Sequence, residues 1–279
     1  MKHMMMNPVL NKEFMLRFRS PKGFLGLLFY LLALALIIVG FIFIQSLTSM
    51  QGFFKPNQSR ELFIMMSFMQ LALILFITPG LTAGIISSER ERQTLNILLT
   101  TTQSSTSIII AKLISSVSYL LLLIIASLPL YSIVFLYGGI SPGQVLQNLV
   151  LYMFTIIVYG AVGVLFSTLI RKTIVSIVTT YGVTLFLAGG TAFITLILLS
   201  YTQGMAGNTP VVNPAPYFTA MLNPPIVLFT LLQPDYMGEF SRLTGIEFPL
   251  WGAFLISYTI LFVAALLCSI KKLRPNMKR

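Results

Sequence analysis

The chain has 279 residues, of which 56% are hydrophobic and only 9% are charged. This composition excludes an ordinary soluble globular domain and is typical of a protein that crosses a membrane several times. The net charge of +11 does not indicate a nucleic-acid partner, because the basic residues lie beside apolar runs rather than on a soluble domain. A single cysteine, Cys268, excludes an internal disulfide, and a single histidine, His3, leaves no imidazole pair for zinc.

The first predicted element is an amphipathic helix that begins near Asn7. Pro8 follows it, and proline is favoured at the first position of a helix. Apolar side chains then recur every four residues, opposite a mainly basic face. The apolar positions are Leu10, Phe14 and Phe18, and the charged ones are Lys12, Glu13, Arg17 and Arg19. We expect residues 1–22 to lie in the membrane interface and to contact anionic lipid; the alternative is a solvated basic flank of the first span.

Six apolar runs follow, and each is long enough to cross the hydrocarbon core as a helix. They cover residues 24–47, 62–86, 108–137, 146–170, 174–200 and 250–270. The ten-residue alternation of a membrane β-strand does not occur, and an open sheet leaves its backbone unsatisfied in lipid. We therefore predict an all-α fold, a six-span helix bundle that forms one domain over residues 1–279.

The distribution of Lys and Arg predicts the orientation of the bundle. Fifteen of these residues lie in segments on the same side as the N-terminus, and three, Lys55, Arg60 and Arg242, lie on the other side. Cytoplasmic loops carry such an excess of basic residues. We expect a multi-pass protein of the cell membrane with both termini in the cytoplasm.

The long outer segment, residues 201–249, contains a short apolar run from Ile226 to Leu232. Asn223, Pro224 and Pro225 precede the run, as at the start of a helix. The run is too short to cross a membrane. It is predicted to form a re-entrant or interfacial helix, and the alternative is an ordered apolar loop that packs on the bundle.

The motifs of soluble catalysis are missing from the sequence. The phosphate-binding pattern G-x-x-x-x-G-K-[ST] does not occur, and neither does G-x-S-x-G or H-E-x-x-H. The chain is therefore not expected to be an enzyme or to hold a cofactor. None of the predicted spans contains Asp or Glu, which disfavours an ion-coupled carrier. Lys112 is the one charge inside a run, and we expect its ammonium to extend to the headgroups.

A charged stretch between the second and third runs interrupts this apolar sequence. Ser88 and Glu91 have the spacing of a capping box, in which Ser88 would be the N-cap. Leu95, Leu98 and Leu99 would then form the apolar stripe of a helix that ends in the polar cluster of residues 100–105. We predict a cytoplasmic amphipathic helix within the loop of residues 87–107.

This loop resembles that of type-2 ABC exporter permeases. In that family an acidic pair, a Thr-Leu and a Leu-Leu precede a turn rich in Thr and Ser and then a Lys. The corresponding residues here are Glu89 and Glu91, Thr94-Leu95, Leu98-Leu99, residues 100–105, and Lys112. The family often has Gly before the Thr-Leu and Pro in the turn, where this chain has Gln93 and Gln103. Residues 7–13 and the six-span layout are also similar to the family.

The resemblance implies the membrane-spanning subunit of an ATP-driven exporter. Two permease subunits, identical or related, would pair, and each would dock one ATP-binding subunit, which carries the Mg-ATP. The docking surface would consist of the N-terminal helix and the loop helix, with the coupling residues Glu89, Arg90, Glu91, Arg92, Thr94, Leu95, Leu98 and Leu99. Low charge in the spans favours an apolar or amphiphilic substrate. The alternatives are a secondary carrier or channel, and a membrane sensor or scaffold that uses residues 201–249.

Overall fold

The computed structural model describes residues 14–15, 18–48, 56–95, 104–136, 140–206 and 212–273. All regular structure in these ranges is helical, and six helical runs in them are long and apolar enough to cross a membrane. The prediction of an all-helical fold with six helices of membrane-spanning length is therefore confirmed. In the ranges just given, the bundle consists of these helices and of the short helices that connect them.

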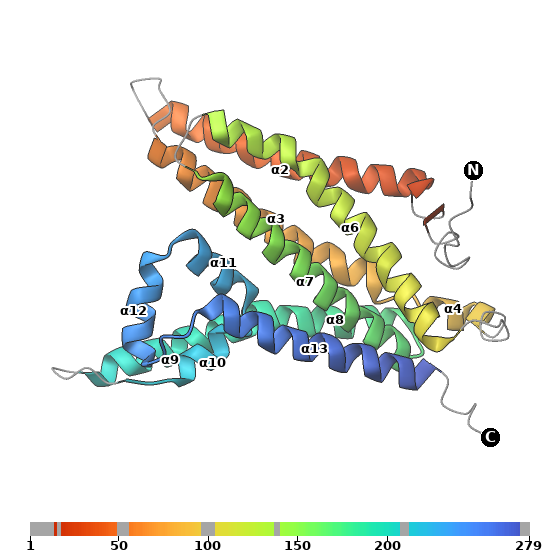
Figure 1. The fold of residues 1–279 in the computed structure, drawn as a ribbon. Helices are drawn as coiled ribbons and strands as arrows, with labels where there is room; N and C mark the ends of the chain where they lie inside the picture. Colours follow the sequence, from red (N-terminus) through yellow and green to blue (C-terminus); the bar gives the residue numbers. More distant parts are fainter. Residues whose placement is uncertain are drawn as a thin grey trace.

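The helices of the six runs agree with the predicted spans to within several residues. They are α2 (Pro21–Thr48), α3 (Pro56–Thr82), α6 (Ser105–Leu136), α7 (Pro142–Leu169), the sequence α8 (Thr173–Leu185), η1 (Phe186–Gly190) and α9 (Thr191–Ala206), and α13 (Leu250–Leu273). The start of α2 and the end of α13 lie at the same end of the bundle, beside the short helix α4 (Ser87–Glu91) (Figure 1). We call this the α4 end.

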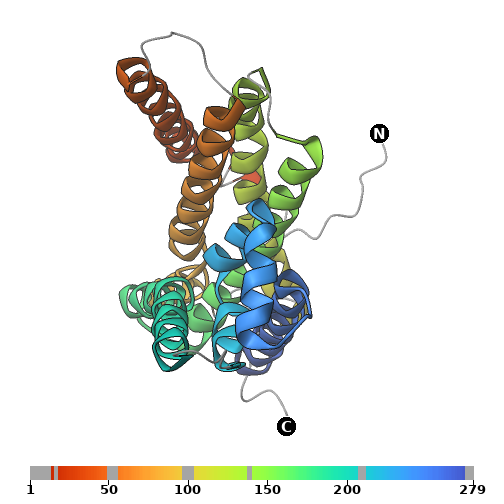
Figure 2. The same ribbon diagram turned by 90° about the vertical axis from the view of Figure 1, so that its left-hand side faces the viewer.

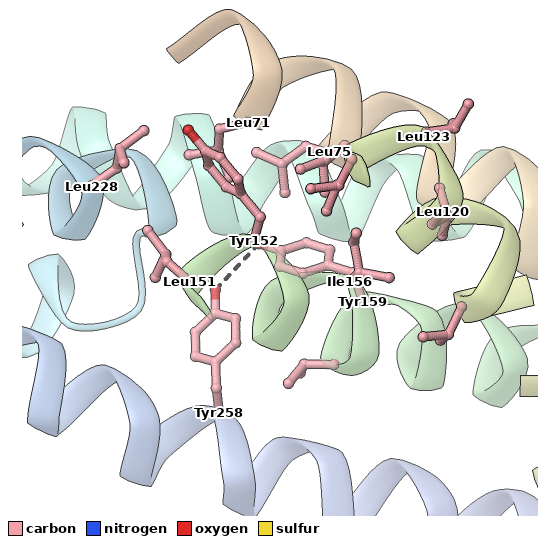
Figure 3. Close-up of a cluster of buried hydrophobic side chains, with 14 of the residues drawn as sticks. Leu71, Leu75, Leu120, Leu123, Leu151, Tyr152, Ile156, Tyr159, Leu228 and Tyr258 are labelled. Carbon is pink, nitrogen blue, oxygen red and sulfur yellow. Dashed lines mark hydrogen bonds between the residues drawn. The ribbon is translucent and has the colours of Figure 1, made fainter. Parts of the chain in front are cut away.

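Helix α7 lies at the centre of the bundle. It packs against α3, α6, α8, α13 and the short helix α11 (Pro224–Leu232). Figure 1 shows α3 and α7 between α2 and α6 on one side and α8, α9 and α13 on the other. In Figure 2, α8 and α9 lie at the lower left of the bundle and α13 lies at the lower right. The apolar core follows α7, where the side chains of Tyr152, Ile156 and Tyr159 meet leucines of α3 and α6 (Figure 3). The hydroxyls of Tyr159 and Tyr258 lie 3.2 Å apart and join α7 to α13.

Buried hydrogen bonds join α3, α6 and α7 along the core. Gln70 accepts a hydrogen bond from the Tyr131 hydroxyl and donates one to Ser127 Oγ at 3.2 Å. Asn148 Nδ2 donates to Ser67 Oγ at 3.0 Å. Lipid tails offer no hydrogen-bond partners, so separating the three helices would leave these polar groups unpaired at a cost in free energy.

Helices α3 and α7 approach each other closely at Gly163. A Cβ atom built on this glycine would lie 2.0 Å from Thr82 Oγ1 and 2.8 Å from Thr82 Cβ. Thr82 is fully buried and bonds the Thr78 carbonyl at 2.7 Å, so it has little freedom to move away.

We therefore expect Gly163→Ala to lower the free energy of unfolding by about 3 kcal/mol, the upper range for overpacking of a core. Gly182→Ala is the matched control, because a Cβ on Gly182 of α8 meets nothing within 4 Å. Thermal unfolding in detergent measures both. Equal midpoints for the two variants would contradict the close packing at Gly163.

The segment between α9 and α13 is more helical than we predicted. It contains α11 and two helices that we did not predict, α10 (Ala215–Ala220) and α12 (Asp235–Thr244). Gly245 ends α12 in the left-handed conformation at φ +70°, which glycine adopts without strain. The predicted helix at residues 226–232 is confirmed as part of α11, with Asn223 as its N-cap and Pro224 at its first position.

The turn between α10 and α11 lies at the depth of the middle of the fifth and sixth spans. The Tyr258 hydroxyl, from the middle of α13, donates to the Leu222 carbonyl at 2.8 Å. The Asn223 amide donates to Ala188 O at 2.5 Å and to Thr191 Oγ1 at 2.8 Å. Helices α10 and α11 therefore enter the bundle from the end opposite α4 and return to it, as a re-entrant hairpin does.

A π-helix, η1, interrupts the fifth span beside this turn. The wider turn of a π-helix changes which backbone amides its carbonyls pair with. Two carbonyls of η1, those of Leu187 and Ala188, accept hydrogen bonds from the Asn223 amide. Two glycines, Gly189 and Gly190, lie within η1. The amide of Asn223 thus supplies hydrogen bonds at a place where the helix departs from α geometry.

Candidate functional site

The charged stretch after α3 forms a shorter helix than we predicted. Helix α4 begins at Ser87, and its N-cap position is Ile86, which has helical backbone angles and no side-chain cap. The predicted capping box is therefore wrong. The Ser88 amide is already bonded to the Gly84 carbonyl at 3.0 Å, because the backbone passes from α3 into α4 through a helical turn. The Arg90 amide is likewise bonded to the Ile86 carbonyl at 3.0 Å, so the Ser88 side chain does not face a free amide in this turn.

Glu91 caps a different helix instead. Its Oε1 accepts a hydrogen bond from the Thr173 amide at 3.0 Å, and its Oε2 accepts one from Thr173 Oγ1 at 2.7 Å. Thr173 is the first residue of α8, whose N-cap residue Lys172 gives no side-chain cap. A carboxylate at this position also interacts favourably with the positive end of the helix dipole. Glu91 thus connects α4 to the start of the fifth span.

The chain turns sharply after α4. Gln93 has φ +59°, in the left-handed region, and Thr94 Oγ1 donates back to the Glu89 carbonyl at 3.2 Å. The prediction of one continuous helix from Ser88 is therefore wrong, since α4 ends at Glu91 and helical backbone resumes only at Thr94 and Leu95. Leu95 is buried at 5% exposure. Leu98 and Leu99 lie outside the described residues.

The backbone at Gln93 predicts a stabilising substitution. A non-glycine residue in the left-handed region carries about 1 kcal/mol of strain, which Gln93→Gly would relieve. We expect this variant to unfold at a higher temperature than the native chain, and Gln93→Ala, which keeps the Cβ atom, to unfold near the native midpoint. If the glycine and alanine variants have the same midpoint, the conformation at Gln93 is not left-handed.

Glu89 and Lys112 form an ion pair at the base of α4. Lys112 Nζ lies 2.7 Å from Glu89 Oε1, and the exposures of the two side chains are 2% and 24%. The prediction that Lys112 extends to the headgroups is therefore wrong, because the ammonium lies inside the protein and pairs with a carboxylate 23 residues earlier in the chain. The pair connects α4 to α6.

Three further contacts connect this region to α7 and α8. Arg90 Nη2 donates to the Thr168 carbonyl in the last turn of α7 at 3.1 Å. Ser167 Oγ accepts hydrogen bonds from the amides of Ile86 and Ser87 at 2.8 and 3.0 Å. Ser176 Oγ of α8 donates to the Ala83 carbonyl at 2.6 Å. The connection from α3 to α4 is thus bonded to α6, α7 and α8.

The remaining predicted site residues are only partly described. Arg92 is exposed, and its guanidinium forms no hydrogen bond or ion pair with another described residue. The Phe14 ring stacks on Phe18 at 5.7 Å, and Phe18 meets Tyr119 of α6 at 6.2 Å. Leu10, Lys12, Glu13 and Arg17 lie outside the described residues. The part of the N-terminal helix that is described therefore contacts the third span.

Sequence reasoning missed the partners of the charged residues. Ser167, Thr168 and Thr173 bracket the short turn Ile170-Arg171-Lys172 between α7 and α8, and hydroxyl residues beside such a turn are a signal for capping. Within the described ranges, no three His, Cys, Asp or Glu side chains gather as a metal ion requires. The described site consists of hydrogen bonds and the Glu89–Lys112 ion pair, and these contacts hold α4 against α6, α7 and α8.

No protein-family model matches the chain, and no curated protein matches it.

Proposed function

We propose that the chain is the permease subunit of an ATP-driven ABC exporter. A second permease subunit, identical or related, would complete the path, and a separate ATP-binding subunit carrying Mg-ATP would drive it. The sequence of residues 86–99, which resembles the coupling loop of type-2 exporter permeases, suggests this function. The contacts of α4 support it most directly.

The supporting observation is that α4 is bonded to three spans at once. Glu89 bonds α6, Arg90 bonds α7 and Glu91 bonds α8, within three consecutive residues. A force applied to α4 by a partner would therefore reach α6, α7 and α8 through short polar contacts. A solitary carrier has no evident need for such a connection on a helix outside its apolar spans.

The orientation belongs to the same proposal. The α4 end carries Arg90, Arg92, Arg171, Lys172 and, on the last turn of α13, Lys271 and Lys272. This excess of basic residues supports a cytoplasmic location for the α4 end, the side on which an ATP-binding subunit would dock. Both chain termini would lie on that side of the cell membrane.

The substrate we propose is an apolar or amphiphilic molecule such as a drug, a peptide or a lipid. A recess of about 530 Å³ lies between α2, α3, η1 and α11, and its lining is almost entirely apolar, with Met65, Phe68, Met69, Ala188 and Pro225 among its residues. Recesses of this size hold drug-sized ligands. It offers no charge that would select a strongly ionic substrate.

Purification of the tagged chain from its native membranes tests the proposal. We expect an ATP-binding protein to copurify in comparable amount, and ATP hydrolysis by the complex in liposomes to respond to the permease. Glu91→Ala should leave the complex assembled but weaken this response severalfold, because α8 loses its link to α4. Glu247→Ala, which removes an exposed carboxylate outside this site, is the control. Uptake of fluorescent amphiphiles driven by an ion gradient without ATP would instead support a secondary carrier.

A further inference from the structure

The acidic and basic residues of α4 have different surroundings. Glu89 is paired with the buried Lys112, so that its charge is neutralised inside the chain. Both carboxylate oxygens of Glu91 are bonded to Thr173. The acidic residues that the sequence places on a docking surface are therefore used to attach α4 to the bundle. Of the two, only Glu91, which is exposed and bonded to an uncharged residue, keeps its negative charge at the surface.

The basic residues of the same region remain on the outside. Arg92, the C-cap residue of α4, is exposed, and so are Arg171 and Lys172 in the turn between α7 and α8. The Glu91–Thr173 contact places that turn directly beside α4. Arg171 is close enough to act electrostatically on Arg90, and Lys172 on Glu91. The exposed charge on α4 and this turn is thus mainly positive.

We infer that the docking surface for the ATP-binding subunit includes the α7–α8 turn as well as α4, and that its partner presents an acidic groove. This inference rests on the proposed function and specifies the chemistry of the partner at that site. We define the basic docking surface as the three exposed residues Arg92, Arg171 and Lys172.

Charge complementarity is the argument for an acidic protein partner. Arg90 lies near enough to Arg171 for the two positive charges to interact. Among the described residues, the Arg90 guanidinium donates a hydrogen bond to the Thr168 carbonyl and not to a carboxylate. Like charges held together are unfavourable in the free chain, and carboxylates placed opposite them would relieve this repulsion and steer association. Glu91 extends from the same surface, and a protein groove that combines charges of both signs can accommodate it better than a uniformly anionic lipid surface.

The test measures binding of the copurified ATP-binding protein, isolated and returned to the chain in nanodiscs made only of zwitterionic lipid. Arg171→Gln combined with Lys172→Gln removes two charges of the basic docking surface. Lys271→Gln combined with Lys272→Gln removes two exposed charges from the last turn of α13 and is the matched control. All four residues are exposed, and unchanged thermal midpoints will show that both variants are folded.

We expect the Arg171 and Lys172 variant to bind roughly tenfold more weakly at moderate ionic strength, as two lost ion pairs at an interface rim would give. Its binding should also depend less on salt. The Lys271 and Lys272 variant should bind within about twofold of the native chain. Equal losses in the two variants, or none in either, would overturn the inference. So would a loss that appears only with anionic lipid, which assigns these charges to headgroups.

Failure of the proposed function gives a different result. If no ATP-binding protein binds the native chain, the proposed function fails before any variant is compared. If one binds tightly and its binding is indifferent to salt and to Arg171 and Lys172, the exporter proposal stands and only the basic docking surface is wrong.

Discussion

Replacement of Glu89 by alanine is expected to lower the free energy of unfolding by about 3 kcal/mol, because it leaves the Lys112 ammonium buried without its partner. Lys112→Met should cost less, about 1 kcal/mol, since the remaining Glu89 side chain is 24% exposed and can be hydrated. The double variant Glu89→Leu with Lys112→Met should recover most of the loss, because an apolar pair replaces a buried ion pair with little penalty. Reversible denaturation in micelles measures all three free energies.

The asymmetry between the two single variants is the informative part of this cycle. Equal losses would mean that the two charges are equally solvated, and no recovery in the double variant would mean that the pair does not interact. The cycle also decides how coupling should be tested. Glu89→Lys alone sets two ammonium groups against each other, so that a loss of ATPase response would report damage to the fold. The double variant Glu89→Lys with Lys112→Glu keeps an ion pair at this place and exchanges the positions of the positive and negative charges. It is therefore the better variant for testing coupling.

Replacement of Asn223 by alanine should have an effect of similar size, about 3 kcal/mol. The side chain is fully buried, and its Oδ1 caps α11 through the Ile226 amide at 2.8 Å. Its amide donates to two carbonyls of η1 and to the Thr191 hydroxyl. Loss of the cap accounts for about 1 kcal/mol, and the carbonyl left without a donor in an apolar interior accounts for the rest.

Asn223→Asp sharpens this prediction. Aspartate keeps the capping oxygen but replaces the amide with an oxygen that faces two carbonyls, so that it should be at least as destabilising as alanine. Asn213→Ala is the control, because Asn213 also caps a helix, α10, but is only partly buried. We expect a loss of about 1 kcal/mol there. An aspartate variant as stable as the native chain would show that the Asn223 amide does not serve the η1 carbonyls.

The spans and α11 could be predicted because their signals are local. A run of twenty apolar residues has few alternatives to a helix in lipid, and Asn-Pro-Pro marks a helix start whatever surrounds it. The capping box at Ser88 was a local signal too, but the turn after Thr82 already pairs the Ser88 amide. Local spacing does not reveal whether a backbone donor is already occupied by the preceding turn.

The partners of the candidate site could not be predicted in this way. Lys112 stood out as a charge in an apolar run, yet its neutralisation depends on how α6 packs beside α4. Glu91 and Thr173 are 82 residues apart in the chain, and their contact exists only because α7 returns to the α4 end. Such pairings depend on tertiary packing, which cannot be deduced from composition or periodicity.

The π-helix has a mechanical consequence for the fifth span. The hydrogen-bonded turn of a π-helix contains one residue more than that of an α-helix. The segment η1 therefore contains an extra residue between α8 and α9. Converting that turn to α geometry would advance one half of the span relative to the other without breaking it. Contacts of Glu91 and Ser176 hold α8 to the α4 region, whereas Asn223 holds the far side of η1 to the re-entrant hairpin. If α4 receives a displacement from a partner, as we propose, a change of turn geometry at η1 would let α8 move while α9 stays in place.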